Sequence, residues 1–476
     1  MKSYTTCFIL FLSITLISEV NFIEIPIGIN FAEPWSVQAV NMDGDDDTDI
    51  LSSSRLDNKI AWWEKTENGY DYHQISNQSY SAMGLVAFDI DNDEDIDVVC
   101  TSQVNGVELW VNNGNQVFNR QIVEYWPCPT YVDSADVNLD GLTDILVCCC
   151  ENNSNRMGWI ENLGNLEFAS HEVMTNWHQA NSIDAGDIDS DGDIDLIGTA
   201  SGREVGHGEI IIFYNDGDEF FTPDTLYATS DRPSFAIIRD LDQDGDLDVL
   251  ATICYLNQAI WFENIDNEFQ DAQTIGYGLN RGLTLDVADF DNDDDMDVIS
   301  SSINLNRLYW FENIDMEFTT HIVSYNYSGA ADVYPFDMDE DGDMDFLSTA
   351  QYDNKVSLWE NQLLTSCEEY QIAGSNQDFQ LQNCPNPFNP STTISFELNT
   401  ETSENTELMI YNLKGQQIKN LSPSLCHPEL IEGRGNKYSI TWNGTDNSGK
   451  PVSSGIYFYK LKSGNFEHTK RMILMK

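Results

Sequence analysis

Hydrophobic and polar residues follow a repeated four-part pattern over roughly residues 22–365. Each repeat has an alternating stretch such as Ser234–Arg239, then an acidic turn, then an apolar stretch such as Val249–Ile253. A third stretch carries an aromatic doublet and ends at Asn, as in Ile260–Asn264, and a fourth resembles Phe318–Val323. Short runs rich in Val, Ile and aromatic residues between turn residues are typical of β-strands. The pattern predicts four short strands per repeat, which is the content of one β-propeller blade.

The aromatic third strand recurs in every repeat, and we interpret its rings as packing between blades rather than as a ligand platform. Its seven copies are Ala61–Glu64, Leu109–Asn112, Gly158–Glu161, Ile212–Asn215, Ile260–Glu263, Tyr309–Glu312 and Leu358–Asn361.

The acidic turns share one nine-residue pattern, shown most fully by Asp187–Asp195: carboxylates at positions 1, 3, 5 and 9, and Gly at position 6. Side chains at alternate positions of a tight turn converge on one point, and Ca²⁺ takes six to eight oxygen ligands. The turns begin at Asn41, Asp89, Asp136, Asp187, Asp240, Asp289 and Asp337. A period of about 50 residues indicates a propeller or a solenoid. We therefore expect up to seven Ca²⁺ ions on an all-β fold.

The seventh repeat ends after Leu358–Asn361 and lacks its fourth strand. The segment Phe22–Ile27 has the pattern of that missing strand. A ring leaves no exposed sheet edge if the amino-terminal strand completes the last blade. We predict a seven-bladed propeller over residues 22–365, closed by residues 22–28.

The formal net charge of −58 falls almost entirely before Cys367, and much of it lies in the acidic turns. A surface so negative argues against nucleic acid as a partner. Residues 1–18 have the pattern of a secretory signal, with Lys2 before an apolar run too short to span a bilayer. We expect no membrane span in the mature chain. Cys100 and the run Cys148–Cys150 are interpreted as small buried residues.

The acidic turns resemble the FG-GAP and VCBS-type repeats of extracellular β-propellers, such as the integrin α-subunit headpiece. The resemblance implies Ca²⁺ coordination by side chains at positions 1, 3, 5 and 9 and by the backbone carbonyl at position 7. Positions 1, 3, 5, 7 and 9 are, turn by turn, Asn41, Asp43, Asp45, Asp47 and Asp49; Asp89, Asp91, Asp93, Asp95 and Asp97; Asp136, Asn138, Asp140, Leu142 and Asp144; Asp187, Asp189, Asp191, Asp193 and Asp195; Asp240, Asp242, Asp244, Asp246 and Asp248; Asp289, Asp291, Asp293, Asp295 and Asp297; Asp337, Asp339, Asp341, Asp343 and Asp345.

Two turns depart from this pattern. Asn41 replaces the first carboxylate of the first turn, and Asn138 replaces the second carboxylate of the third. Fewer charges should weaken cation binding there. Asp46, Glu94 and Asp294 stand where Gly is expected, which predicts a strained turn.

A polar linker over residues 366–380 precedes a second region, residues 381–476, with predicted strands at Thr393–Leu398, Leu408–Tyr411, Tyr438–Trp442, Gly455–Leu461 and Lys470–Leu474. This pattern predicts a small Ig-like β-sandwich. The segments Asn383–Pro390, Ile410–Gly415, Trp442–Asp446, Gly449–Tyr457 and Lys470–Lys476 resemble the type A sorting domain of the type IX secretion system. The resemblance implies that residues 381–476 are recognised by that machinery and that the protein is secreted or lies on the cell surface.

The connections from each fourth strand to the next first strand carry an aromatic residue or Arg. In a propeller they lie around the central channel, on the face opposite the acidic turns. Rim packing and a shallow surface for a glycan or a surface protein are both open interpretations. The candidate residues are Trp35, Tyr80, Trp126, Trp177, Arg232, Tyr277, Arg281 and Tyr327.

Catalytic patterns were sought and not found: the sequence contains no G-x-S-x-G, P-loop or H-E-x-x-H segment. His73, His171 and His321 recur at matching places in the fourth strand, which favours a role in the fold. Our leading hypothesis is a secreted, calcium-binding propeller that acts as a binding or adhesion module and is not an enzyme. The alternative is a polysaccharide lyase or glycoside hydrolase that uses the face opposite the turns, including Trp126 and Trp177.

Overall fold

The computed structural model describes residues 20–45, 47–149, 155–202, 208–217 and 220–362, and, in the carboxy-terminal part, residues 381–384, 392–398, 406–412, 414, 416–421, 436–447, 449–463 and 466–474. The predicted signal at residues 1–18, the linker at residues 366–380, Asp46 and Cys150 lie outside these residues. The chain divides into two compact units, one made of the residues up to Asn361 except Glu340–Gly342 and the other made of Glu340–Gly342 and the residues from Gln362 onward. All the regular elements described are strands, which confirms the all-β fold class.

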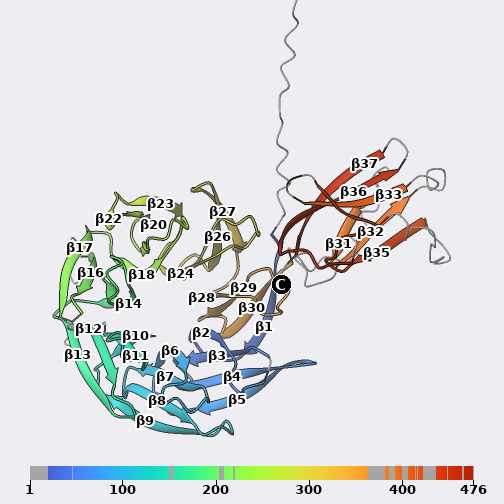
Figure 1. Ribbon diagram of the computed structural model, residues 1–476. Helices are drawn as coiled ribbons and strands as arrows, with labels where there is room; N and C mark the ends of the chain where they lie inside the picture. Colours follow the sequence, from blue (N-terminus) through green and yellow to red (C-terminus); the bar gives the residue numbers. More distant parts are fainter. Residues whose placement is uncertain are drawn as a thin grey trace, which may run out of the picture. The chain divides into compact units, whose positions relative to one another are not determined.

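Within the described part of residues 20–362, the strands form seven antiparallel four-stranded sheets arranged in a ring (Figure 1), the number that the repeats predict. The innermost strands are β2 (Pro34–Val40), β6 (Ala82–Phe88), β10 (Pro129–Ala135), β14 (Ala180–Gly186), β18 (Pro233–Arg239), β24 (Gly282–Ala288) and β28 (Ala330–Phe336). The second strands are β3 (Asp49–Ser54), β7 (Asp97–Ser102), β11 (Asp144–Cys149), β15 (Asp195–Ala200), β19 (Asp248–Ile253), β25 (Asp297–Ser302) and β29 (Asp345–Ala350).

The third strands are β4 (Lys59–Thr66), β8 (Gly106–Asn112), β12 (Arg156–Asn162), β16 (Gly208–Asn215), β20 (Gln258–Phe262), β26 (Arg307–Ile314) and β30 (Lys355–Asn361). The outer strands are β5 (Gly69–Ser76), β9 (Phe118–Glu124), β13 (Phe168–Thr175), β17 (Phe221–Thr229), β23 (Gln273–Tyr277), β27 (Glu317–Ser324) and β1 (Phe22–Ile29). A short hairpin of β21 (Asn264–Ile265) and β22 (Glu268–Phe269) extends the fifth sheet's third strand.

Each innermost strand contacts the innermost strands of both neighbouring blades, and β2 contacts β28, so the ring is closed. The last blade is completed by β1, which pairs antiparallel with β30 from Phe22 opposite Asn361 to Ile29 opposite Lys355. The Phe22 ring also makes edge contacts with Phe290 and Phe346, at centroid distances of 5.6 and 5.1 Å. The amino-terminal strand therefore removes the open sheet edge, as the sequence predicts.

Burial explains why the strands differ in composition. All six residues of every second strand are buried, because a neighbouring blade covers each face of the sheet. Outer strands such as β5 and β9 alternate between exposed and partly buried residues. The predicted aromatic strands supply core rings, among them Trp62, Trp159 and Trp261. Cys100, Cys148 and Cys149 are likewise buried in hydrophobic clusters, as expected.

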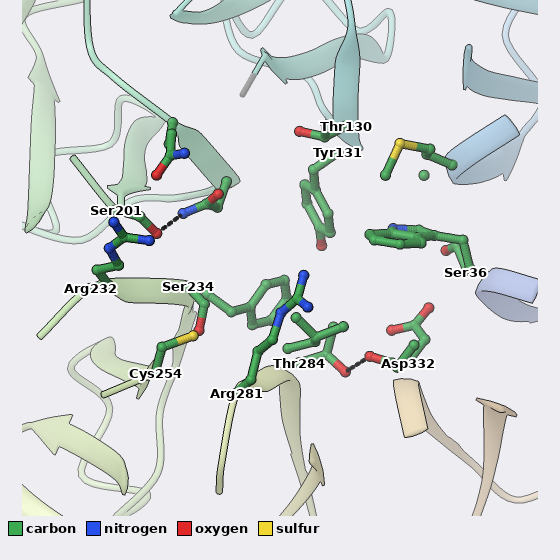
Figure 2. Close-up of a pocket in the computed structure, with 18 of the residues that line it drawn as sticks. Ser36, Thr130, Tyr131, Ser201, Arg232, Ser234, Cys254, Arg281, Thr284 and Asp332 are labelled. Carbon is green, nitrogen blue, oxygen red and sulfur yellow. Dashed lines mark hydrogen bonds between the residues drawn. The ribbon is translucent and has the colours of Figure 1, made fainter. Parts of the chain in front are cut away.

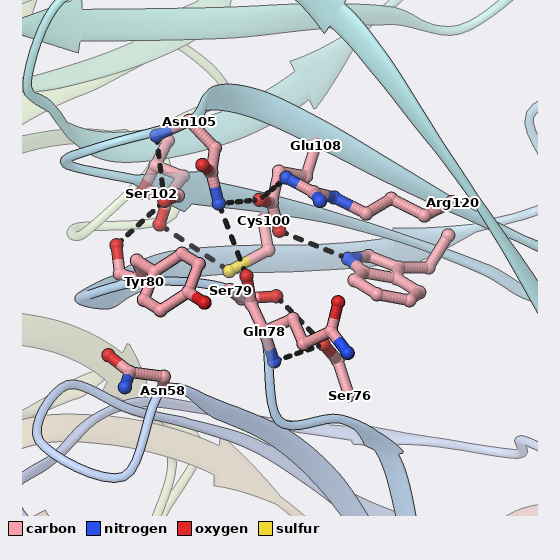
Figure 3. A network of polar contacts seen from close by, with 12 residues as sticks. Asn58, Ser76, Gln78, Ser79, Tyr80, Cys100, Ser102, Asn105, Glu108 and Arg120 are labelled. Carbon is pink, nitrogen blue, oxygen red and sulfur yellow. Dashed lines mark hydrogen bonds and ion pairs between the residues drawn. The ribbon is translucent and has the colours of Figure 1, made fainter.

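The second blade has a buried carboxylate, Glu108, within a network of polar contacts (Figure 3). Glu108 on β8 is 0% exposed and accepts hydrogen bonds from Asn105 Nδ2 (2.6 Å) and Trp110 Nε1 (3.3 Å). It also forms an ion pair with Arg120 on β9 (2.5 Å). The corresponding residues of the flanking blades are Ala61 and Gly158, so the network is a local feature of the second blade and no part of the repeat.

The second unit contains two sheets. One holds β31 (Leu381–Cys384), β32 (Thr392–Leu398) and β35 (Asn436–Trp442). The other holds β34 (Gln417–Asn420), β33 (Thr406–Asn412), β36 (Gly455–Ser463) and β37 (Phe466–Leu474). Side chains of both sheets share one core, which includes Phe396, Ile410, Trp442 and Tyr459. The five predicted strands are present, and β31 and β34 are additional.

Candidate functional site

All seven acidic turns connect an innermost strand to the second strand of its blade, so they lie at one end of the ring. In five turns, the residues at positions 1, 3 and 9 each offer one oxygen, and these oxygens lie within 4.8 Å of one another. These sets are Asp89, Asp91 and Asp97; Asp187, Asp189 and Asp195; Asp240, Asp242 and Asp248; Asp289, Asp291 and Asp297; Asp337, Asp339 and Asp345. In these turns the structure thus brings together three of the five predicted positions.

The aspartate at position 9 anchors each turn to its sheet. Asp195, the first residue of β15, is 0% exposed and accepts backbone N–H bonds from Ile188 (3.1 Å) and Asn215 (2.7 Å). The same two bonds recur in all seven turns, with distances of 2.7–3.2 Å. This carboxylate therefore ties the turn, the second strand and the third strand together, a structural role beyond the predicted one.

Positions 5, 6 and 7 shape the turn. The position-5 carboxylate of Asp191 accepts the backbone N–H of Asp193 at 3.0 Å. Position 6 has a left-handed backbone in every turn where it is described, including the two non-glycine residues Glu94 (φ 74°) and Asp294 (φ 78°). The strain predicted at these two residues is therefore present. At position 7, the side chain of Asp246 accepts the N–H of Asp266 at 2.8 Å, which holds the turn against the hairpin between the third and fourth strands.

The electrostatics of the turns favour a bound cation. Burial raises the pKa of Asp195 to about 7, against the lowering effect of its two backbone hydrogen bonds, and the carboxylates of Asp189 and Asp191 raise it further. The Oδ1 atoms of Asp187 and Asp240 are buried without a hydrogen-bond partner. Buried carboxylate oxygens of one sign require protons or a cation to offset their repulsion. Their hard oxygen donors fit Ca²⁺.

The turns that contain Asn41 and Asn138 keep the backbone hydrogen bonds of the other turns, but they offer different oxygen atoms to a cation. The side chain of Asn41 accepts the N–H of Gly44 at 2.8 Å, and its amide donates to the carbonyl of Asp45. Asn138 accepts the N–H of Asp140 at 3.1 Å. Each amide supplies an oxygen without a charge, so these turns offer a weaker set of ligands.

The opposite end of the ring contains a cavity of about 500 Å³ around the central channel (Figure 2). Three of the predicted ligand residues line it: Trp35, Arg232 and Arg281. Its floor is formed by Tyr131 and Phe235, whose rings meet edge to face at 5.5 Å. A pocket of this volume is within the usual range of small-molecule sites, about 300–1,000 Å³.

The other predicted ligand residues divide into two groups. Tyr80 and Tyr277 are 50% and 64% exposed. Trp126, Trp177 and Tyr327 are 0%, 4% and 0% exposed, and each ring donates a hydrogen bond inside the protein, to Ser170, Glu209 and the carbonyl of Ser348. These three rings pack between blades and cannot offer a face to a ligand, so their assignment to the ligand surface is corrected.

Exposed tyrosines surround the cavity end, and most of them were missed by sequence reasoning. We call this set the tyrosine rim: Tyr80, Tyr125, Tyr255, Tyr277, Tyr325 and Tyr352, each at least 50% exposed. Every one lies in or next to a connection at the end opposite the acidic turns. Tyr125 and Tyr325 are one and two residues from the buried Trp126 and Tyr327, so the pattern located the connection but not the exposed ring. Exposed aromatic residues gathered on one face mark interaction surfaces.

Beneath the floor, the channel narrows to a second cavity of about 290 Å³ with a charged wall. Arg239 on β18 donates to Asp184 on β14 (3.1 Å) and to Asp286 on β24 (3.2 Å). Burial raises the pKa of Asp133, which faces the same group. The ion pairs join three consecutive blades across the channel, and we assign them to ring stability.

The recurring histidines have a structural role. His73, His171 and His321 each contact a glutamate of the neighbouring strand at 2.7, 2.8 and 2.7 Å. Each imidazole also stacks on a tryptophan of its own blade, at 4.3–4.5 Å between ring centroids. They lie on β5, β13 and β27 of three different blades, so each belongs to the packing of its own sheet.

The ring of four-stranded sheets with a repeated acidic turn defines a repeat β-propeller. The profile of the FG-GAP-like repeat matches residues 41–100, 89–147, 136–198, 240–300 and 289–348, and the chain belongs to this family. Residues 384–475 match the secretion system C-terminal sorting domain. The protein is therefore a type IX export substrate that is secreted or lies on the cell surface.

No curated protein matches this chain. Among solved structures, the crystal structure of BBS1N in complex with ARL6DN, soaked with mercury, is similar with a TM-score of 0.49 at 11% identity. The similarity covers 71% of this chain and 95% of that chain. In the part of the chain that the structure describes, no helix has the length and apolar character to cross a membrane.

Proposed function

We propose that this protein is a calcium-stabilised binding module that works outside the cell or on its surface. The acidic turns would bind Ca²⁺ through positions 1, 3, 5 and 9 and the carbonyl at position 7, with the turns at Asp89, Asp187, Asp240, Asp289 and Asp337 as the strongest sites. Bound Ca²⁺ would neutralise carboxylates that burial otherwise makes costly to ionise. Its role in this proposal is to hold the ring, because the turns lie away from the cavity.

The observation that carries the binding role is the pairing of a cavity of about 500 Å³ with the tyrosine rim at the same end of the ring. Tyrosine gives a large apolar contact area and a polar hydroxyl, and its side chain loses little conformational entropy on binding. We propose a glycan or a surface protein as the ligand. Rigid blades hold the connections that form this surface, so its geometry exists before the ligand arrives.

The test is binding of the calcium-loaded mature protein to an array of neutral and acidic polysaccharides. We expect binding that weakens at least tenfold when Tyr255 and Tyr277 are both changed to Ser. The paired control is Tyr72→Ser, which removes a tyrosine from the outer strand β5, away from the cavity. If the protein bound none of the polysaccharides, the proposal that its ligand is a glycan would be overturned. New chain ends in the bound polysaccharide would instead support the lyase or hydrolase alternative.

A further inference from the structure

The cavity at the tyrosine rim carries positive charge in a chain whose formal net charge is −58. Its described lining residues include three arginines, Arg55, Arg232 and Arg281, and one carboxylate, Asp332. Asp332 uses one oxygen to accept the N–H of Val37 at 3.0 Å, and burial raises its pKa to about 6. The acidic turns lie at the other end of the ring. The local excess of cationic groups therefore favours an anionic ligand in this cavity.

Among the described residues, two of the three arginines have no carboxylate partner. Arg55 forms an ion pair with Glu33 at 2.6 Å. Within the described residues, none of the ion pairs involves Arg232 or Arg281. The Nε atom of Arg232 is buried without a hydrogen-bond partner. A buried donor left unpaired is costly unless a ligand completes it.

Both arginines extend into the cavity, as Figure 2 shows. The guanidinium of Arg232 lies over the ring of Tyr255, 5.0 Å from its centroid. Burial raises the pKa of the Cys254 thiol, and a hydrogen bond with Ser234 and the charges of Arg281 and Arg232 oppose this rise. Because both guanidinium groups lie near Cys254, the two positive charges are in the same part of the cavity.

The backbone beneath both side chains is strained. Arg232 has φ 56° and Arg281 has φ 55°, in the left-handed region. Each stands eight residues before its acidic turn, and this register position is left-handed in every blade. The seven residues are Glu33, Ser81, Cys128, Gln179, Arg232, Arg281 and Gly329. Glycine meets this geometry without strain and occupies it in the last blade. The conformation therefore belongs to the repeat, and Gly can replace either arginine without distorting the backbone.

The rest of the lining suits a sugar. Amide side chains circle the cavity, and they can exchange hydrogen bonds with hydroxyl groups. These are Gln103, Gln179, Asn181, Asn280 and Asn304. Trp35, Tyr131 and Phe235 add apolar ring surface. Several of these amides also hydrogen-bond within the protein, as Asn304 does to Asn280 at 2.9 Å. Their remaining polar atoms, the rings and the arginines can together contact a polyhydroxylated ligand that carries one charged group.

Resting on the proposed binding role, we propose that this cavity binds an acidic oligosaccharide, with Arg232 and Arg281 holding its carboxylate or sulfate group. Guanidinium groups bind planar or tetrahedral oxyanions through paired charge-assisted hydrogen bonds. Loss of one such contact should weaken binding about ten- to a hundredfold.

The experiment compares matched ligands by calorimetry on the calcium-loaded full-length mature protein. The carboxylate arm uses an oligogalacturonate and its fully methyl-esterified form, and the sulfate arm uses a carrageenan oligosaccharide and its desulfated form. In at least one of these two comparisons, the charged oligosaccharide should bind about tenfold or more tightly than its neutral form. Added salt should weaken the binding of the charged oligosaccharide. Arg232→Gly and Arg281→Gly should each remove this preference without lowering the unfolding temperature, because Gly relieves the left-handed strain.

Ser81→Gly is the control, since it makes the same backbone change at a residue that does not line the cavity and removes one hydrogen bond to the Gln103 side chain (2.8 Å) but no charge. Equal affinity for the charged and the neutral oligosaccharide of each pair would overturn the proposal that the arginines bind an anionic group. The proposed glycan-binding role would not be affected. Arginine variants that bind as the parent does would also overturn it. Tighter binding of oligo-aspartate than of any saccharide would reject the ligand class. Failure of all four saccharides to bind, combined with no binding on the polysaccharide array, would reject the glycan-binding role itself.

Discussion

Residues with a left-handed backbone recur at fixed positions in each blade. At these positions a side chain other than that of Gly strains the backbone. Positions 4 and 6 of the acidic turn both have positive φ, for example Ser190 (φ 58°) and Gly192 (φ 99°). The sequence pattern predicts this for position 6, where Gly is frequent. It does not reveal position 4, because Asn, Ser, Gln, Glu and Leu occupy it as well. The turn geometry is thus imposed by the acidic cluster and the buried anchor at position 9.

Replacing the strained residues at position 6 should stabilise the protein. We expect Glu94→Gly and Asp294→Gly each to raise the free energy of unfolding by about 1 kcal/mol, since each relieves a left-handed side chain. Chemical denaturation at saturating calcium measures this. Gly192→Ala is the opposite change at the same position, and it should destabilise by a similar amount. If the Gly variants were less stable than the parent, strain at position 6 would not limit the turn.

The buried carboxyl of Asp332 makes the free energy of unfolding depend on pH. Burial raises its pKa to about 6, from 3.8 for an ordinary Asp. Folding therefore favours the protonated form of Asp332. The contribution of this carboxyl to the free energy of unfolding is fully present below about pH 4, near its pKa in the unfolded chain, and is lost as the pH rises through about 6. Asp332→Asn keeps the acceptor for the N–H of Val37 but loses the one for the N–H of Val333 (3.1 Å), so it should lower the unfolding temperature less at pH 8, where it also removes a buried charge, than at pH 4. Asp184→Asn is the contrasting variant, because it removes a partner of Arg239 and should destabilise at pH 8.

Strands were the most predictable level of the structure. The repeat predicted four per blade, and the five strands named in the carboxy-terminal region are all present. β34 (Gln417–Asn420) was missed, because four residues with one aliphatic side chain carry no pattern of their own and are ordered by pairing with β33. Burial of individual rings was less predictable. Trp126 and Tyr125 are adjacent, and their local sequence does not indicate which one faces the neighbouring blade.

The closing strand should be necessary for a monomeric ring. A protein starting at Trp35 lacks β1 and exposes the backbone of β30, from Lys355 to Asn361. We expect it to associate or unfold, because an open edge pairs with other chains. Light scattering coupled to size exclusion measures this. Glu24→Ala is the matched control, since it removes side-chain contacts to β30, the ion pair to Lys355 (2.5 Å) and the hydrogen bond from Ser357 (2.9 Å), and leaves the strand pairing intact. A monomeric, folded protein without β1 would contradict the closure.

At the scale of the whole propeller, the two ends of the ring have different chemistry. Carboxylates gather in the turns at one end, whereas the other end mixes carboxylates such as Glu33, Asp57, Asp231 and Asp353 with seven basic residues: Arg55, Lys59, Arg156, Arg232, Arg281, Arg307 and Lys355. The sequence predicted the acidic end, because each turn is a contiguous pattern. It located the cavity end only in outline, because Arg55, Tyr131 and Phe235 come from different blades and meet only in the closed ring. The acidic turns attract cations, and the arginines that line the cavity attract an anion to that cavity.

The central claim is that calcium holds the acidic turns in place, and thermal unfolding of the mature protein against free Ca²⁺ tests it most directly. A ligand that binds only the folded state stabilises it by about 2.7 kcal/mol per site at a concentration one hundred times its Kd. With several sites, the unfolding temperature should rise by about 10 °C or more between EGTA and saturating Ca²⁺, and less with Mg²⁺. An unfolding temperature that is the same in EGTA and in Ca²⁺ would contradict the account.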